Sequence, residues 1–173
     1  KTIGAAKTVQ VSGVTKSGAD AGNYTITQPT TTATITAKGL TVTGITATNR
    51  VYDASVSATA LLDKTSAALS GVVAGDTVTM DHTSATASFA DKAIGAGKTV
   101  SITGITIGGA DSGNYTLSQP STTADITAKT LTVSGITAAN KTYNASTVAT
   151  LSTGSAAFVG VESGDTVTIG VGS

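Results

Sequence analysis

Several residue types are rare or absent in this chain. Among its 173 residues there is no cysteine and no tryptophan, only 2 prolines, 3% aromatic residues and 12% charged residues. The absence of cysteine excludes a disulfide scaffold and a cysteine-based zinc site. Ten basic residues balance ten acidic ones, so the basic surface of a nucleic-acid binder is missing. No apolar run approaches the ~20 residues that a membrane helix requires. We therefore expect no nucleic-acid partner and no membrane insertion.

Threonine dominates what is present, with 36 positions that alternate with valine, isoleucine and leucine. β-Branched side chains favour strands, and the strong helix formers Glu, Gln, Arg and Met are scarce. The sequence therefore predicts an all-β fold without a long helix. Alternation places strands at 40–45, 58–62, 76–80, 87–89, 98–105, 114–118 and 124–128, with a further one beginning at Val51 and Tyr52.

An internal repeat runs through the chain. The run Asp20-Ala21-Gly22-Asn23-Tyr24 recurs 91 residues later as Asp111-Ser112-Gly113-Asn114-Tyr115, and residues 49–55 recur as 140–146. Further along, Gly75-Asp76-Thr77 recurs 89 residues later as Gly164-Asp165-Thr166. The changed spacing predicts a two-residue deletion, which we place near 62–66.

The phase of the repeat predicts the domain organisation. Residues 39–129 form one complete module, 1–38 the C-terminal half of a preceding module, and 130–173 the N-terminal half of the next. A period near 90 residues fits a sandwich domain better than the shorter coil of a β-solenoid. Each half module exposes an apolar face and unpaired edges. We therefore expect 1–38 to pack head-to-tail against 130–173 of an identical copy, or the chain to be an excerpt of a continuous fibre.

A turn motif narrows the fold class. Asp20 with Tyr24, and Asp111 with Tyr115, share one spacing and follow a long alternating strand. This arrangement is typical of the tyrosine corner in immunoglobulin-like domains, where the hydroxyl bonds to backbone just upstream. We interpret these four residues as structural corners. Almost no turn residues separate 126–129 from 131–133, and a short connection limits bending. The fold class predicted is all-β, with tandem immunoglobulin-like β-sandwich modules forming an extended rod.

The motifs resemble a known family. Residues 40–45, the run Asn49-Arg50-Val51-Tyr52-Asp53-Ala54-Ser55, Gly71–Asp76, Ala110–Tyr115 and the closing Ile126-Thr127-Ala128-Lys129 are similar to the YDG domain. The resemblance covers the whole chain and departs from the family pattern at Ala54 and at Asn144-Ala145. It implies tandem repeats of large bacterial surface proteins, often filamentous-haemagglutinin-like adhesins. It also implies a structural stalk without established catalytic residues.

Candidate reactive groups each have a simpler structural interpretation. His82, the only imidazole, could serve a catalytic triad or a metal site, but a surface loop residue is the expected role. Gly95-Ala96-Gly97-Lys98 lacks the spacing and the helix of a phosphate loop and is interpreted as a hairpin turn. Turn aspartates are potential calcium ligands, although such residues usually bond their own backbone. The aspartates concerned are Asp53, Asp76, Asp91 and Asp111.

Three further possibilities stay open. Thr-x-Thr pairs could form an ice-binding array or be the solvent face of a half-buried sheet. Asparagine sequons could be glycosylated. A Lys–Asn isopeptide bond could involve Lys38 or Lys129. The threonine pairs are 25/27, 34/36, 41/43 and 77/79, and the sequons begin at Asn23, Asn114, Asn140 and Asn144.

These observations favour a non-catalytic structural module. We expect a stalk of a secreted adhesin or fibre on a bacterial cell surface, with neighbouring modules of the same fibre as partners. We expect no enzyme activity, no catalytic residue, no cofactor and no bound metal. The alternative is a module that itself binds a glycan or ice through threonine-rich sheet faces.

Overall fold

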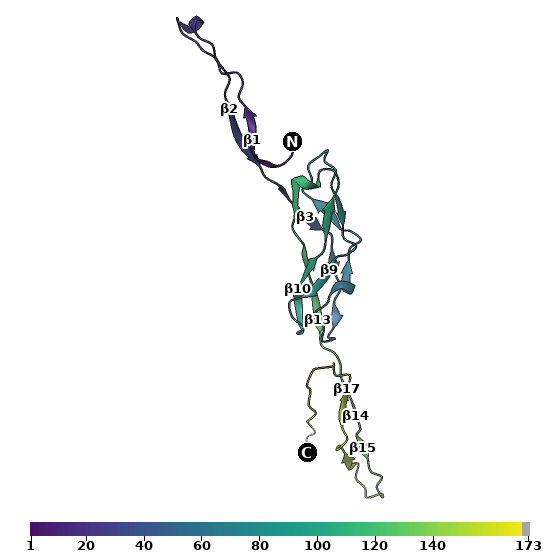
Figure 1. The fold of residues 1–173 in the computed structure, drawn as a ribbon. Helices are drawn as coiled ribbons and strands as arrows, with labels where there is room; N and C mark the ends of the chain where they lie inside the picture. The colour runs from purple at the N-terminus through teal and green to yellow at the C-terminus, as the bar shows by residue number, and fades with distance from the viewer. Residues whose placement is uncertain (171–173) are drawn as a thin grey trace. The chain divides into compact units, whose positions relative to one another are not determined.

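The protein is built from strands (Figure 1). The structure, a computed structural model, describes residues 1–170. Helical segments in this range are three short 3-10 turns, η1 (Ala21–Asn23), η2 (Thr59–Leu61) and η3 (Ser112–Asn114). The predicted all-β class, without a long helix, is therefore confirmed. Within residues 1–170, none of the helical turns has the length and apolarity that would span a membrane.

The chain divides into two compact units. Unit 1 contains residues 1–45, 64–85 and 102–120, and unit 2 contains 46–63, 86–101 and the chain from 121 onward. Each unit therefore combines stretches that are distant in the sequence. The module ranges 1–38, 39–129 and 130–173 remain a prediction.

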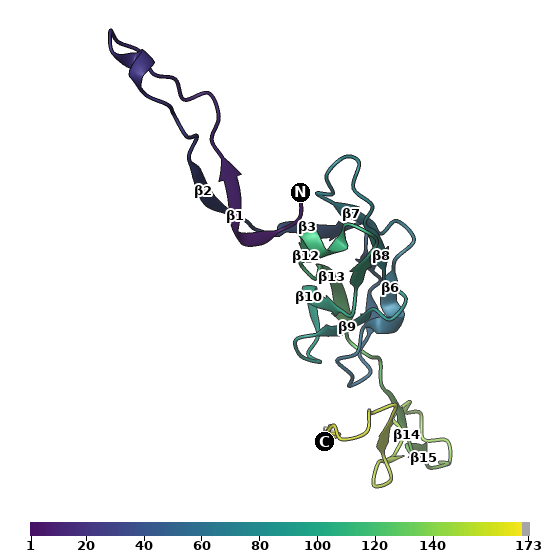
Figure 2. The same cartoon turned by 45° about the horizontal axis from the view of Figure 1, so that its top comes forward.

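Unit 1 holds a two-stranded hairpin and two small sheets. In the hairpin, β1 (Gly4–Gln10) pairs antiparallel with β2 (Thr30–Ile35), and η1 lies in the long loop between them (Figure 2). The other sheets have the orders β12-β3-β7 and β11-β8, with the β12–β3 pairing parallel. Their strands are β3 (Lys38–Thr43), β7 (Ala68–Ser70), β8 (Thr79–Asp81), β11 (Thr106–Gly108) and β12 (Tyr115–Leu117).

Unit 2 is centred on a four-stranded sheet of order β5-β13-β10-β9, in which β5 and β13 run parallel. Three two-stranded pairs, β4-β6, β14-β17 and β15-β16, complete it. The long strand β10 continues two residues into unit 1. The strands are β4 (Thr46–Ala47), β5 (Arg50–Val51), β6 (Leu62–Asp63), β9 (Thr86–Phe89), β10 (Gly95–Thr103), β13 (Ser121–Thr127), β14 (Thr132–Ser134), β15 (Thr137–Ala138), β16 (Leu151–Ser152) and β17 (Ala157–Val159).

Strand registers follow the sequence repeat. In β1–β2, Gly4 is opposite Ile35, and in β10–β13 the equivalent Gly95 is opposite Ile126. Both pairs carry a register shift at the same place, after that glycine. The β3–β7 pairing likewise matches β14–β17 residue for residue. Equivalent sequences therefore form equivalent strand pairs.

These registers correct the predicted position of the two-residue deletion. Leu62 is opposite Ala47 in β6–β4, and Leu151 is opposite Ala138 in β16–β15. Since these pairs are equivalent, the two residues are lost before Leu62 rather than near 62–66. The deletion falls at η2, which has no counterpart in the C-terminal segment.

Two predicted strands also need correction. The range 58–62 forms η2 followed by β6, because the Thr59 hydroxyl accepts the Ala87 amide at 2.9 Å and draws the chain into a turn. The range 76–80 becomes strand only at Thr79, where β8 begins. Before that point, the Thr77 amide donates to a carboxylate oxygen of Asp111 at 2.9 Å instead of to a neighbouring strand.

The cores of both units are small and mainly aliphatic, with one aromatic side chain in each. In β3 the burial pattern alternates, so Leu40 and Val42 are buried while Thr41 and Thr43 face outward. This alternation is typical of a sheet with one solvated face. The buried side chains of unit 1 are Leu40, Val42, Ile45, Ala85, Ile102, Ile105 and Tyr115, and those of unit 2 are Ala58, Ala87, Phe89, Val100, Ala124 and Ile126.

Candidate functional site

Two equivalent turns each present an aspartate to a lysine and a tyrosine that are distant in the sequence. In Gly75-Asp76 and Gly164-Asp165 the glycine has a positive φ, +88° and +87°, which most L-residues avoid. A backbone hydrogen bond closes each turn: the Asp76 N–H donates to the Val73 carbonyl, and the Asp165 N–H donates to the Glu162 carbonyl. Because the two turns have the same backbone geometry, both carboxylates lie at the tip of the same kind of loop.

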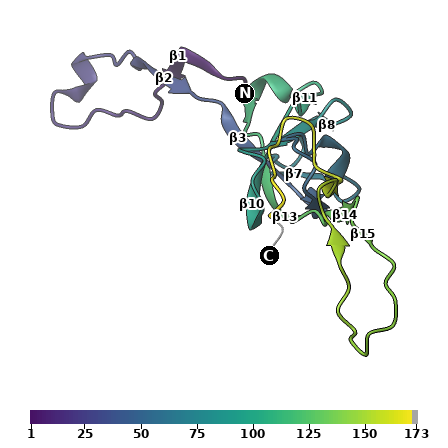
Figure 3. The same ribbon diagram turned by 90° about the horizontal axis from the view of Figure 1, so that it is seen from below.

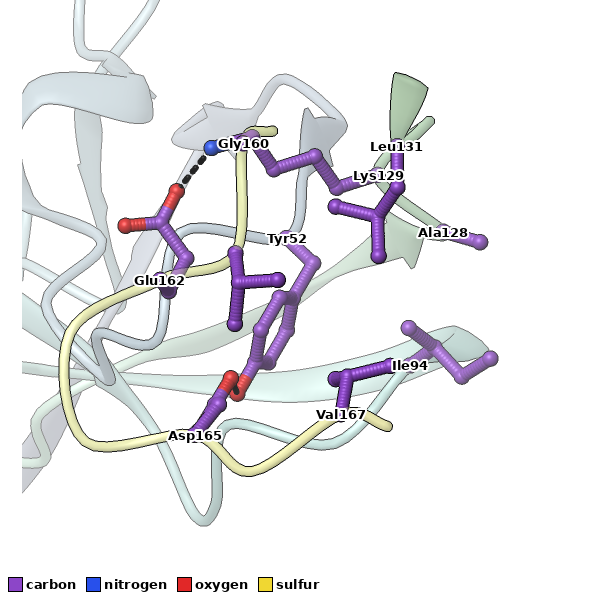
Figure 4. Close-up of a pocket in the computed structure, with 10 residues that line it drawn as sticks. Tyr52, Ile94, Ala128, Lys129, Leu131, Gly160, Glu162, Asp165 and Val167 are labelled. Atoms are coloured by element: carbon purple, nitrogen blue, oxygen red, sulfur yellow. Dashed lines mark hydrogen bonds and ion pairs between the residues drawn. The ribbon is translucent and has the colours of Figure 1, made fainter. Parts of the chain in front are cut away.

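In unit 2, the Asp165 carboxylate accepts bonds from the Lys92 ammonium and the Tyr52 hydroxyl. Figure 4 shows Asp165 beside Tyr52. The Lys92 ammonium donates to Oδ1 at 2.6 Å, and the Tyr52 hydroxyl donates to Oδ2 at 2.6 Å. The same ammonium lies 5.8 Å from the centre of the Tyr52 ring, within the range of a cation–π contact. The Asp165 side chain is only 20% exposed, so solvent screens these contacts less than those of an open surface pair.

The loop around Asp165 also covers an apolar pocket. Ile94, Leu131 and Val167 line it together with the Tyr52 ring, as Figure 4 shows. At its edge the Lys129 ammonium forms an ion pair with Glu162. The Lys92–Asp165 ion pair and the apolar pocket therefore join residues 52–94 to residues 160–167, and the Lys129–Glu162 ion pair holds the same loop to Lys129.

In unit 1, Asp76 has an equivalent environment. The Lys1 ammonium pairs with Oδ1, and the Tyr115 hydroxyl donates to Oδ2 at 2.7 Å. The Tyr115 oxygen also accepts the Val73 amide at 3.0 Å. Lys1 and Asp76 are the repeat equivalents of Lys92 and Asp165, so the same ion pair occurs twice. In both cases the lysine precedes the predicted module boundary and the aspartate follows it.

Ionisation favours these pairs at neutral pH. The bond from Lys92, and after it the bond from Tyr52, holds the pKa of Asp165 below its usual value. The bond from Lys1, followed by that from Tyr115, does the same for the pKa of Asp76. Conversely, bonding to the aspartates raises the pKa of the Lys1 and Lys92 ammonium groups. Burial is the main cause that raises the pKa of the Tyr115 phenol.

The four corner residues differ in environment. Tyr115 is 7% exposed, and Asp111 accepts the Thr77 amide. The Tyr115 hydroxyl bonds to the loop at Val73 and Asp76 rather than to the turn just upstream of its own strand. Tyr24 is 68% exposed, and Asp20 precedes η1 as Asp111 precedes η3.

The other candidates take structural positions. His82 is half-buried, and its Nδ1 atom has no hydrogen-bond partner in residues 1–170. The run from Gly95 to Lys98 opens strand β10, where the Gly97 amide donates to Asp125 at 2.7 Å. Among the described residues, no three His, Cys, Asp or Glu side chains gather in a way that could hold a metal ion.

Sequence reasoning did not find the Lys92–Asp165–Tyr52 cluster. Its hydrogen bonds span 73 and 113 residues of sequence, and the sequence places Tyr52 only in a strand and in the motif that resembles the YDG domain. The available signal was the joint recurrence of Lys1 with Asp76 and of Lys92 with Asp165.

The chain is thus an all-β protein in which a lysine–aspartate pair recurs with the sequence repeat. In each pair a tyrosine hydroxyl donates to the second carboxylate oxygen, but the two tyrosines come from different positions of the repeat. The profile of the YDG domain matches residues 36–124 and 127–173, which is more than half of the chain. The chain therefore belongs to the YDG domain family. No curated protein and no solved structure gives a significant match.

Replacing the buried phenol tests its role in unit 1. Tyr115→Phe removes a bond to a carboxylate and leaves the Val73 amide unpaired, so we expect the melting temperature to fall by about 3 °C. Tyr143→Phe is the matched control, because Tyr143 is 90% exposed and its change leaves the melting temperature unaltered. Differential scanning calorimetry measures both, and equal melting temperatures for the two variants would contradict the role.

Acid tests the Asp165 cluster. A carboxyl with a lowered folded pKa stabilises the fold above its unfolded value, about 3.8, and loses that contribution as pH falls through the folded pKa. We expect the β17 amide signals to disappear at lower urea in Asp165→Asn than in the native chain at pH 6. The difference in urea midpoint between the two proteins should shrink as the pH falls below about 3.8.

The control for this titration is Asp91→Asn. Asp91 pairs with Lys98, and this contact lowers the pKa of Asp91. Its replacement should change how the urea midpoint of the β10 amide signals depends on pH. The pH dependence of the β17 amide signals should stay as in the native chain. A constant difference between native chain and Asp165→Asn from pH 6 to pH 2.5 would show that the Asp165 charge does not hold the segment.

Proposed function

We propose that the chain is a non-catalytic structural stalk of a bacterial cell-surface adhesin or fibre. In this proposal the chain is secreted, and its YDG domains are tandem repeats as in filamentous-haemagglutinin-like adhesins. Each repeat is an immunoglobulin-like β-sandwich, and successive repeats form an extended rod. The modules hold a distal binding region away from the cell.

The Lys92–Asp165–Tyr52 cluster carries this proposal, together with the recurrence of its ion pair as Lys1–Asp76. Lys92 and Tyr52 belong to the predicted module 39–129, whereas Asp165 belongs to the predicted segment 130–173. A stalk needs junctions that resist bending, and a partly buried carboxylate with two donors is directional. Only four residues separate β13 from β14, which further limits the motion between consecutive modules.

The composition also supports a structural role. The chain has no cysteine to oxidise and a formal net charge of zero. The aspartates weighed as calcium ligands, such as Asp76 and Asp111, serve instead as acceptors for lysine, tyrosine and backbone donors. Polar side chains are thus engaged in holding loops together.

A second candidate is ligand binding by threonine-rich faces. The observation that favours it is the outward row on β3, where Thr41 and Thr43 alternate with buried residues. Hydroxyl and methyl groups in a regular array could contact a glycan or ice. The natural twist of strands works against a flat array of this kind.

Solid-phase binding separates the two candidates. For a stalk, we expect the 173-residue chain to show no saturable binding to immobilised host glycans at concentrations up to about 1 mM. Saturable binding that disappears in Thr41→Val with Thr43→Val would contradict the stalk as the sole role. Valine is the matched replacement because it keeps the side-chain shape and removes the hydroxyl.

A further inference from the structure

Two parallel pairings in the middle of the chain join strands that are far apart in the sequence. In unit 1, β12 pairs with β3, with Leu117 opposite Leu40, and the Ser118 N–H donates to the Leu40 carbonyl at 3.0 Å. In unit 2, β13 pairs with β5, with Ile126 opposite Arg50. In each unit, therefore, an early strand lies directly beside a late one and runs in the same direction.

The parallel direction determines how a pull along the chain acts on these bonds. A pull on the residues before Lys38 draws β3 and β5 towards their N-terminal ends. A pull on the residues after Thr127 draws β12 and β13 towards their C-terminal ends. Parallel strands drawn in opposite senses slide past each other, so the bonds of the ladder are loaded together rather than one after another.

Side chains lengthen the β5–β13 ladder. The Asn49 side-chain amide donates to Asp125 Oδ2 at 3.1 Å, and the Asp125 N–H donates to Asn49 Oδ1 at 2.7 Å. Further along, the Tyr52 N–H donates to the Thr127 carbonyl at 2.9 Å, and the Thr127 hydroxyl donates to the Arg50 carbonyl at 3.3 Å. The ladder therefore extends over the whole run from Asn49 to Tyr52.

The Asp125 carboxylate also connects β13 to its other neighbour. Asp125 Oδ1 accepts the Gly97 amide at 2.7 Å, at the bulge where the β10 register shifts between Gly95 and Lys98. β10 lies beside β13 on the side opposite β5 (Figure 3). One side chain thus bonds to segments on both sides of the strand that receives the load.

The Arg50 side chain holds β5 to the rest of unit 2. It is 9% exposed, and its guanidinium lies 4.9 Å from the centre of the Phe89 ring in β9. The same guanidinium donates to the Ser57 carbonyl at 2.7 Å and forms an ion pair with Asp53. A pull on β5 therefore meets these contacts in addition to the β5–β13 ladder.

We propose that the β12–β3 and β5–β13 pairings form a mechanical clamp, through which the chain bears tension along its length. The Asn49–Asp125 pair is the side-chain part of this clamp. The inference rests on the proposed function only in taking tension as the load that a stalk meets. The clamp itself is a property of the strand directions and of the bonds between the strands.

The direction of the pull tests the clamp. Since the chain has no cysteine, pairs of introduced cysteines can carry thioether-linked handles for optical tweezers. Handles at Thr36→Cys and Thr130→Cys make the strands slide, and unfolding from them releases up to about 300 Å of chain. Handles at Thr48→Cys and Ser121→Cys pull on the N-terminal ends of β5 and β13 and open the same ladder bond by bond. All four side chains are exposed, and we expect the first pair of handles to require the higher unfolding force.

Removal of the Asn49 side chain tests its part in the clamp. Unfolding under force is governed by the unfolding rate, and a bond that is broken in the transition state changes that rate by its full contribution. Between the Thr36 and Thr130 handles, we expect Asn49→Ala to unfold about 10-fold faster than the native side chain at constant force. Thr127→Val keeps the side-chain shape and removes the bond to Arg50, so it should act in the same direction and to a smaller extent.

The matched control is Gln119→Ala. The Gln119 side-chain amide also makes two bonds, accepting the Ile105 N–H at 3.1 Å and donating to the Ile105 carbonyl at 2.8 Å. Neither residue belongs to β3 or β5, so these bonds do not join the strands that the pull draws apart. Gln119→Ala should lower the urea midpoint as Asn49→Ala does and leave the unfolding rate under force unchanged. Native amide signals of β10 in each variant show that the chain is folded.

Two outcomes would overturn the clamp. One is an equal unfolding force for the two pairs of handles, and the other is an equal unfolding rate under force for Asn49→Ala and Gln119→Ala. Neither result depends on glycan binding, so the clamp can fail while the stalk assignment stands. Conversely, saturable glycan binding would revise the function and leave the force measurements unchanged.

Discussion

The interaction on which the architecture depends is an aspartate carboxylate held by a lysine ammonium and a tyrosine hydroxyl. An exposed ion pair alone contributes little to stability. Here the Asp76 and Asp165 side chains are 9% and 20% exposed, and the tyrosine bond fixes the direction of the second oxygen. Because the aspartate sits on a tight glycine turn, holding its carboxylate also positions the loop. Each carboxylate therefore holds its loop in place without a disulfide.

This linkage matters because the hydrophobic cores are small. The chain contains no tryptophan and 3% aromatic residues, so burial comes mainly from aliphatic side chains such as Leu40, Val100 and Ile126. Threonine on the alternate positions keeps the strands soluble and stiff. Stability then depends on pairing each strand with a neighbour, and in the two-stranded pairs β1–β2 and β14–β17 the side chains of Val9, Ile35 and Val133 are exposed.

Local patterning predicted much of the fold. Alternation located the strands around Val42, Phe89, Ile102 and Ile126, because the side-chain period of a strand is visible in sequence. It failed where a side chain competes with the backbone ladder, as Thr59 does. Parallel pairings and the Lys92–Asp165 bond were not predicted, because they join residues far apart in sequence and neither residue type is distinctive alone. The repeat showed which residues are equivalent but not which ones touch.

The most direct measurement is the distance distribution between spin labels at Thr99 and Thr132, exposed sites on β10 and β14. If the Lys92–Asp165–Tyr52 cluster fixes the junction, the distribution is narrow in the otherwise native chain. It broadens when Lys92→Met is combined with Tyr52→Phe, and it stays narrow in Lys98→Met, which removes an ion pair within the β10 hairpin. Equal widths in all three proteins would show that the cluster does not set the junction.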